Sequence, residues 1–121
     1  MKKKDFIIWF DNHIKYYKPF LGIDLQEIKI KYDSEVNYLS IGLSYPYLNP
    51  TIYFGEKAFE DFKNNKITKQ TVLHELCHIL TDPLYVKATQ RYVSTDEIEA
   101  ERERLTDTIG NIINNLLEGN K

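Results

Sequence analysis

The chain has 121 residues, a length that suits one domain with a single modest hydrophobic core. Its apolar content of 42% and charged content of 28% are ordinary for a soluble protein, and a net charge of -2 gives no reason to expect nucleic acid or an anionic membrane as a partner. The apolar run from Phe6 to Phe10 is too short for a signal peptide or a membrane span. We therefore expect one cytoplasmic domain over residues 1–121.

The first part of the chain is predicted to form a helix and then a hairpin. Residues 5–18 carry aromatic and apolar side chains at helical spacing, and Pro19 is expected to end this helix. Residues 27–32 alternate between apolar and polar side chains, as strands with one buried face do. A turn at 33–35 would lead into a returning strand at 38–43, which pairs with the first.

A third strand and a short helix are predicted next. Residues 51–54 are β-branched and aromatic, a composition typical of strands, and Gly55 breaks the pattern. The following segment, through Phe59 and Phe62, has the spacing of a short helix. Together with the helices described below, these elements predict an α+β fold with a small antiparallel or mixed sheet of about three strands.

The third predicted helix begins with clear signals. Thr68 suits the N-cap position, and Ile67 with Val72 fits a hydrophobic staple around it. Pro83 disfavours a helical residue before it, so this helix is expected to end near Thr81.

The last predicted helix is long. Ser94 with Glu97 forms a capping box, Val93 with Ile98 forms a staple, and Gly119 is a suitable stop. Apolar side chains recur along one side of this helix and predict its buried stripe: Ile98, Leu105, Ile109, Ile112 and Leu116.

The segment His74-Glu75-Leu76-Cys77-His78 is an H-E-x-x-H motif. Residues four apart lie on one face of a helix, so His74 and His78 can bind one metal ion, and Glu75 can act as general base on a water at that ion. A helical wheel separates these side chains from an apolar face formed by Leu73, Leu76, Cys77 and Leu80. We interpret Cys77, the single cysteine, as a small core residue rather than a ligand.

Two histidines leave a catalytic zinc site incomplete, since such sites have three protein ligands and an open position. No histidine follows His78, so the third ligand must be a carboxylate. The start of the last helix supplies the candidates: Glu97, Glu99, Glu101 and Glu103. A set of two histidines and one glutamate also accepts cobalt, nickel or manganese.

With this motif followed by an acidic helix, the chain resembles the gluzincin metallopeptidases, and especially the small zincin domains encoded by phages and mobile elements. The resemblance covers residues 68–113. It implies a zincin-like fold in which a glutamate on the later helix is the third zinc ligand. In that family the glutamate is often followed by alanine, with an acidic residue four positions on that orients a ligand histidine. Glu99-Ala100 with Glu103 fits this pattern, so we choose Glu99 as third ligand and keep Glu101 and Glu103 as alternatives.

The resemblance implies hydrolysis of a peptide bond, with one zinc ion and a peptide or protein as substrate. Glu75 would take a proton from the zinc-activated water and pass it to the leaving amine. Tyr85, Arg91 and Tyr92 lie between the two ligand helices in sequence and are candidates for the oxyanion site. The predicted strand 51–54 is the candidate edge for pairing with an extended substrate.

Two other functions stay open at the level of sequence. One is a zincin-fold binding module with little or no turnover, although a structural metal site would not need Glu75. The other is a metal-free helical interaction protein, in which the aromatic first helix and the long last helix pack against a partner.

Overall fold

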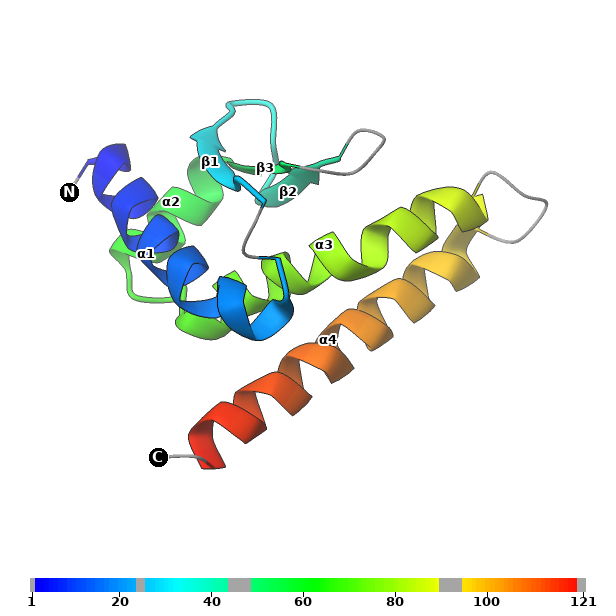
Figure 1. Cartoon of the computed structure of the whole chain (residues 1–121). Coiled ribbons are helices and arrows are strands. Elements are labelled where there is room, and N and C mark those ends of the chain that lie inside the picture. Colours follow the sequence, from blue (N-terminus) through cyan, green and yellow to red (C-terminus); the bar gives the residue numbers. More distant parts are fainter. Residues whose placement is uncertain (1, 24–25, 44–48, 90–94, 120–121) are drawn as a thin grey trace.

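The computed structural model describes residues 2–23, 26–43, 49–89 and 95–119. Within these ranges the chain forms four helices and three strands in the order α1, β1, β2, β3, α2, α3, α4 (Figure 1). The α+β class and the small mixed sheet expected from the sequence are confirmed.

Helix α1, Lys3–Leu21, buries one aromatic and apolar face. Phe6, Phe10 and Ile14 recur at helical spacing and are at most 1% exposed. The prediction that Pro19 ends the helix was wrong, because Pro19 lies inside the last turn and the helix stops at Gly22 in the left-handed conformation, with φ of 70°. A proline removes one backbone donor, and near a helix end that loss leaves the turn intact.

The three strands form one sheet with β3 in the centre. Strand β1 is Lys29–Tyr32, β2 is Leu39–Gly42 and β3 is Thr51–Phe54. The order is β1-β3-β2, with β1 parallel to β3 and β2 antiparallel to it. The predicted hairpin between β1 and β2 was therefore wrong.

The reason for this order is burial. The Ile52 and Phe54 side chains of β3 are both 0% exposed, whereas β1 and β2 each leave at least two residues exposed. The most apolar strand takes the central position, where a neighbour on each side covers its backbone.

The hydrophobic core lies between α1, the sheet, α2 (Glu56–Lys63) and α3 (Lys69–Thr89). The Phe6 ring contacts Phe54 with centroids 4.6 Å apart and Phe62 with centroids 4.8 Å apart. From α3, the predicted core residues Leu73, Leu76 and Cys77 are buried as expected, together with Val72, but Leu80 is 41% exposed. This core fixes the face of α3 that carries the H-E-x-x-H glutamate and histidines.

Helix α3 is longer than predicted. It continues through Pro83 to Thr89 instead of ending near Thr81. Contacts with the last helix hold both sides of the proline: Thr81 Oγ1 lies 2.9 Å from Thr106 Oγ1, and the Arg102 guanidinium lies 4.0 Å from the centre of the Tyr85 ring. These contacts offset the loss of one backbone hydrogen bond.

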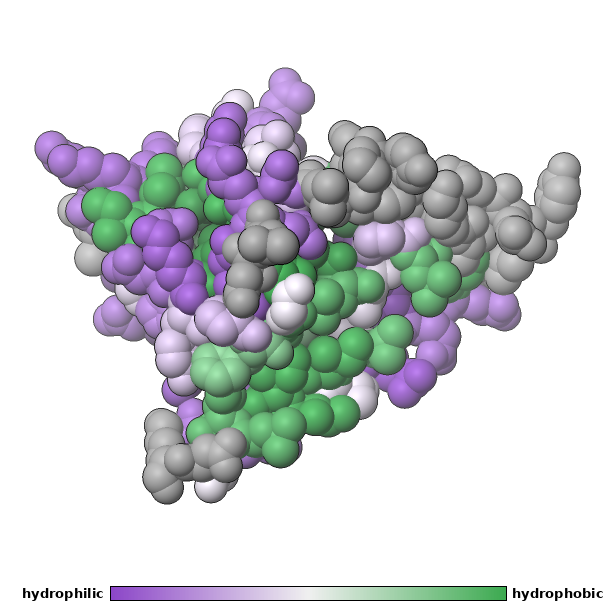
Figure 2. Space-filling view, in the orientation of Figure 1, coloured by the Kyte–Doolittle hydropathy of each residue, from purple (hydrophilic) through white to green (hydrophobic). Residues whose placement is uncertain are grey.

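Helix α4, Thr95–Gly119, runs antiparallel to α3 along its length (Figure 1). Its start agrees with the predicted cap at Ser94, which itself lies outside the described residues. The expected apolar stripe was only partly right, because Leu105, Ile112 and Leu116 are exposed and form an apolar band along α4 (Figure 2). The face turned to α3 instead carries Ile109, Ile113 and Leu117. Among the described helices, none is long and apolar enough to cross a membrane.

Candidate metal centre

Three side chains from α3 and α4 converge at one point. His74 and His78, one turn apart on α3, have Nε2 atoms 3.0 Å from each other. The Glu103 carboxylate of α4 lies 3.5 Å from His74 Nε2 and 3.4 Å from His78 Nε2. These three groups could hold a metal ion, with all ligand atoms within 4.8 Å of one another.

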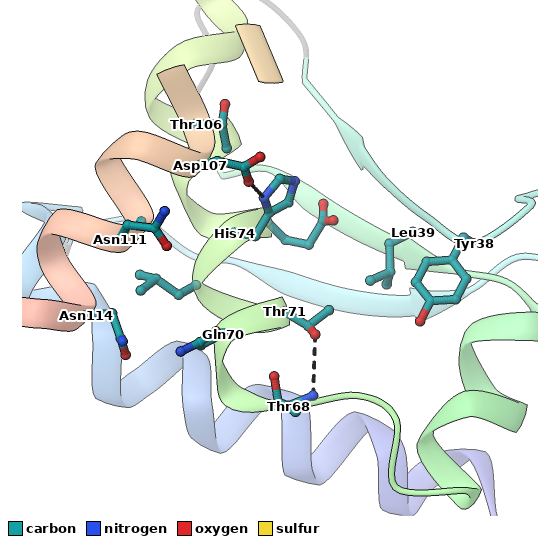
Figure 3. A pocket seen from close by; sticks show the side chains of 13 residues that line it. Tyr38, Leu39, Thr68, Gln70, Thr71, His74, Thr106, Asp107, Asn111 and Asn114 are labelled. Atoms are coloured by element: carbon teal, nitrogen blue, oxygen red, sulfur yellow. Dashed lines mark hydrogen bonds and ion pairs between the residues drawn. The ribbon is translucent and has the colours of Figure 1, made fainter. Parts of the chain in front are cut away.

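Two further carboxylates hold the outer side of each imidazole. His74 Nδ1 lies 2.8 Å from Asp107 Oδ1, drawn as a dashed line in Figure 3, and His78 Nδ1 lies 2.9 Å from Asp82 Oδ1. An ionised carboxylate can only accept, so each Nδ1 carries the hydrogen and donates it. When it is neutral, each imidazole then points the lone pair of Nε2 into the site, as a ligand histidine must.

The geometry fits a small divalent cation. A tetrahedral ion with nitrogen and oxygen ligands at ~2.0–2.2 Å keeps those ligands about 3.3–3.5 Å apart. The observed separations of 3.0, 3.4 and 3.5 Å are close to that range. Two nitrogen lone pairs and a carboxylate repel one another at these distances unless a cation or a shared proton lies between them. The donor set therefore suits an ion such as zinc.

The carboxylate at the histidines belongs to Glu103, an alternative in the sequence analysis, and not to Glu99. Glu99 is about half exposed, and its carboxylate lies 3.7 Å from the Arg102 guanidinium. Helices α3 and α4 are antiparallel, and His78 faces Glu103. Glu99, one turn before Glu103 on α4, therefore lies level with Asp82, which is one turn after His78 on α3. That turn displaces Glu99 by about 6 Å along the axis.

Glu101, the other alternative, points away from the histidines. Its side chain is 68% exposed, and it accepts a hydrogen bond of 2.9 Å from Arg104 Nε. Glu103 and Asp107 also reproduce the pattern of a ligand glutamate followed four residues later by an acid that orients a histidine. The sequence carries this pattern at Glu103 as well as the Glu99-Ala100 pair, and the structure places the Glu103 carboxylate at the histidines.

Glu75 borders the same site from α3. It lines both a polar cavity of ≈ 290 Å³ that contains His74, His78 and Glu103 and a larger neighbouring cavity. Burial raises the pKa of Glu75, and the charges of the two imidazoles oppose that rise. A carboxylate that is partly desolvated in this way suits a group that accepts and returns a proton.

His78 is the more buried of the two histidines, at 8% exposed. Burial lowers its pKa, but the hydrogen bond to Asp82 and the charges of Asp82, Glu75 and Glu103 outweigh it, so the pKa is raised. The same carboxylates that favour a protonated His78 would favour a metal cation at its Nε2.

Arg102 is a site residue that sequence reasoning missed. Its guanidinium lies 3.4 Å from Glu103 Oε1 and 3.9 Å from Asp82 Oδ1, and it lines the polar cavity. Four carboxylates surround the imidazoles, so one cation among them reduces their mutual repulsion. Asp107 was also missed, because only the packing of α3 on α4 brings it to His74. Asp82 was missed because the predicted helix ended near Thr81, whereas α3 continues and places Asp82 one turn after His78.

The predicted oxyanion residues are placed as follows. Tyr85 stacks on Arg102 at the end of α3 and does not line the polar cavity that holds the histidines. Arg91 and Tyr92 lie outside the described residues. His13, on α1, bonds to the Trp9 carbonyl at 2.9 Å and takes no part in the candidate site.

Strand β2 forms the rim of the site. Leu39, Ser40 and Ile41 line the polar cavity opposite the histidines. Gly55 N donates to Tyr38 O, and in an antiparallel ladder this phase makes Ser40–Tyr53, two residues along, a hydrogen-bonded pair. The N–H and C=O groups of Leu39 and Ile41 therefore point away from β3. The predicted edge, strand 51–54, is instead the central strand.

No family model matches the sequence, and comparison with curated proteins and with solved structures gives no match either.

Proposed function

We propose that the chain is a zinc-dependent peptidase with a zincin-like fold, in which His74, His78 and Glu103 bind the ion and Glu75 is the general base. One observation carries the proposal. Two imidazole nitrogens and a carboxylate converge within 4.8 Å, beside a further glutamate and β2, an edge strand of the sheet among the described residues. A purely structural metal site would use four closed ligands and would have no need of Glu75 or the open rim.

The chain's residues divide the chemistry among them. When bound, zinc lowers the pKa of a water and polarises a carbonyl. Glu75 takes the proton of the attacking water and delivers it to the leaving amine, a role that suits a carboxylate whose pKa is raised by burial. Asp82 and Asp107 keep both imidazoles in the tautomer that presents Nε2.

Strand β2 is the strand to which we propose the substrate binds. An extended peptide that pairs with the outward N–H and C=O groups of Leu39 and Ile41 would lie across the opening above the histidines. Backbone pairing of this kind selects an extended conformation and orients one peptide bond towards Glu75. It also explains why the rim beside the site is a strand edge.

Hydrolysis of a mixed peptide library tests the proposal. We expect zinc-loaded wild type to cut library peptides, and Glu75→Gln to cut them at least about 10²-fold more slowly while it retains zinc. The matched control is Glu60→Gln, an exposed glutamate on α2, which should behave as wild type. Equal cleavage by wild type and Glu75→Gln would contradict the proposal, as would zinc-loaded wild type that leaves every peptide intact.

A further inference from the structure

A second cavity, of ≈ 460 Å³, leads away from the metal centre between α3 and α4. It opens beside His74 and Glu75, and its walls come from the first turns of α3, the middle of α4 and the start of β2 (Figure 3). His74 and Asp107 lie at one end, while Gln70 and Asn114 lie at the other. The cavity is therefore continuous with the place where a substrate bond would be cut.

The far end of this cavity is lined by side-chain amides. Gln70 comes from α3, and Asn111 and Asn114 come from the next two turns of α4. Within the described part of the chain, no hydrogen bond joins any of these three amides to another residue. Each amide offers two N–H donors and one carbonyl acceptor to whatever enters.

The lining argues against other ligand classes. The described wall contains no lysine or arginine to pair with a carboxylate, and Glu75 and Asp107 at the near end would repel one. The far end contains no acid for a cation, since Asp107 is held by His74. An apolar side chain would form no hydrogen bond with the three amides, of which Gln70 and Asn111 are exposed and Asn114 is half-buried.

We propose that this cavity receives an asparagine or glutamine side chain of the substrate, held by hydrogen bonds to Gln70, Asn111 and Asn114. The inference rests on the proposed function, because a peptide aligned along β2 places a side chain next to the cut bond at the mouth of the cavity. The N–H groups of a primary amide can donate to the carbonyls of the wall amides, and its carbonyl can accept from their N–H groups. The three amides then determine which peptide bond is cut, and the histidines and glutamates cut it.

A binding experiment tests the cavity without requiring turnover. The side-chain amide signals of zinc-loaded wild type are followed by NMR while N-acetylglutamine amide or N-acetylleucine amide is added. We expect saturable shifts at Asn111, Asn114 and Gln70 with the glutamine probe and at least about tenfold weaker binding of the leucine probe. Asn115, exposed on α4 and outside the cavity wall, is the internal control. Absent shifts, or equal shifts with both probes, would overturn the inference.

Cleavage of a peptide library then separates the two proposals. Wild type should prefer asparagine or glutamine at one fixed position beside the cut, Asn111→Leu should lose that preference at least about tenfold, and Asn115→Leu should keep it. Cleavage with an apolar preference would overturn the inference and leave the peptidase standing. Binding of the glutamine probe without any cleavage would support the cavity and contradict the peptidase.

Discussion

The two sides of α3 are held by different kinds of contact. The side facing α1 and the sheet is apolar and aromatic, with Leu73 and Leu76 packed into the core. The side facing α4 is joined by histidines, carboxylates and the buried hydroxyl pair of Thr81 and Thr106. Among the described residues, none of the fully buried apolar side chains belongs to α4.

This difference indicates separate roles for the two parts. The body formed by α1, the sheet, α2 and α3 is stabilised by burial of apolar area, which does not depend on a metal. Helix α4 contributes only part-buried apolar side chains to the core, Ile109, Ile113 and Leu117, and polar groups also hold it to α3. Two of these polar groups, Glu103 and Asp107, belong to the proposed metal centre. An ion between α3 and α4 would therefore cross-link the less firmly packed helix to the body.

The largest expected effect comes from opening the core. Phe54→Ala removes a fully buried ring that contacts Phe6, and we expect a loss of about 3–5 kcal/mol in the free energy of unfolding. The loss should be the same with zinc and with chelator, because the ring is on the metal-independent side. Urea denaturation under both conditions measures it, and a loss that changes with zinc would contradict the division.

Zinc should stabilise the packing of α4 against α3. At a free zinc concentration 100 times its Kd, the native state should gain about 2.7 kcal/mol. Hydrogen exchange followed by mass spectrometry should show this gain as slower exchange in α4, with little change in α1. In Glu103→Ala the zinc effect should vanish, whereas equal protection of both helices would show that α4 is not the less stable element.

The buried hydroxyl pair should contribute next. Thr106 Oγ1 donates to the Arg102 carbonyl at 2.7 Å and therefore accepts from Thr81, so Thr106→Val leaves the Thr81 hydroxyl without that partner. We expect a loss of about 1–3 kcal/mol, measured by urea denaturation. Thr108→Val is the control, since Thr108 makes the same bond to the helix backbone on an exposed surface and should cost far less.

As the solution is acidified, metal binding should weaken at a higher pH than it would if the ligand histidines had their usual pKa. The pKa of His78 is raised by Asp82, Glu75 and Glu103 against the effect of burial, and a protonated imidazole cannot ligate. Zinc affinity should therefore begin to fall while the pH is still above ~6.5, the usual histidine pKa. Titration calorimetry across pH measures this fall. Asp82→Asn should shift it to lower pH, and an unchanged midpoint would contradict the role of Asp82.

Cys77 reports the docking of α4. Burial raises the pKa of its thiol to about 11, with a contribution from Asp107, and Gly110 of α4 lies over it. Iodoacetamide should therefore label the native protein slowly at pH 8, and chelation should speed the labelling because α4 separates more often. Labelling as fast as that of the urea-unfolded chain, in the presence of zinc, would contradict the packing.

Local patterns predicted the helices and strands, and the faces of α3 and α4 in part. The spacing of His74 and His78, the apolar side of α3 and the strand 51–54 depend on neighbouring residues alone. The sheet order did not follow from such patterns, because the central place of β3 depends on how deeply Ile52 and Phe54 are buried in the whole fold.

The placement of Glu103 rather than Glu99 beside the histidines shares a cause with the error in the length of α3. A helix that ends near Thr81 brings the chain back early and favours a glutamate near the start of α4. Helix α3 instead continues to Thr89, so the chain returns later and Glu103 lies opposite His78. The contacts that carry α3 past Pro83 come from α4 itself, which no local sequence pattern contains.

The most direct test of the central claim is metal content per chain, measured by mass spectrometry on protein purified without a histidine tag. The account predicts about one zinc per chain in wild type and in Glu99→Ala, and none in His74→Ala or Glu103→Ala. Zinc that persists in Glu103→Ala and disappears in Glu99→Ala would reverse the assignment of the third ligand. Wild type that binds no zinc even after the metal is added back would contradict the metal centre itself.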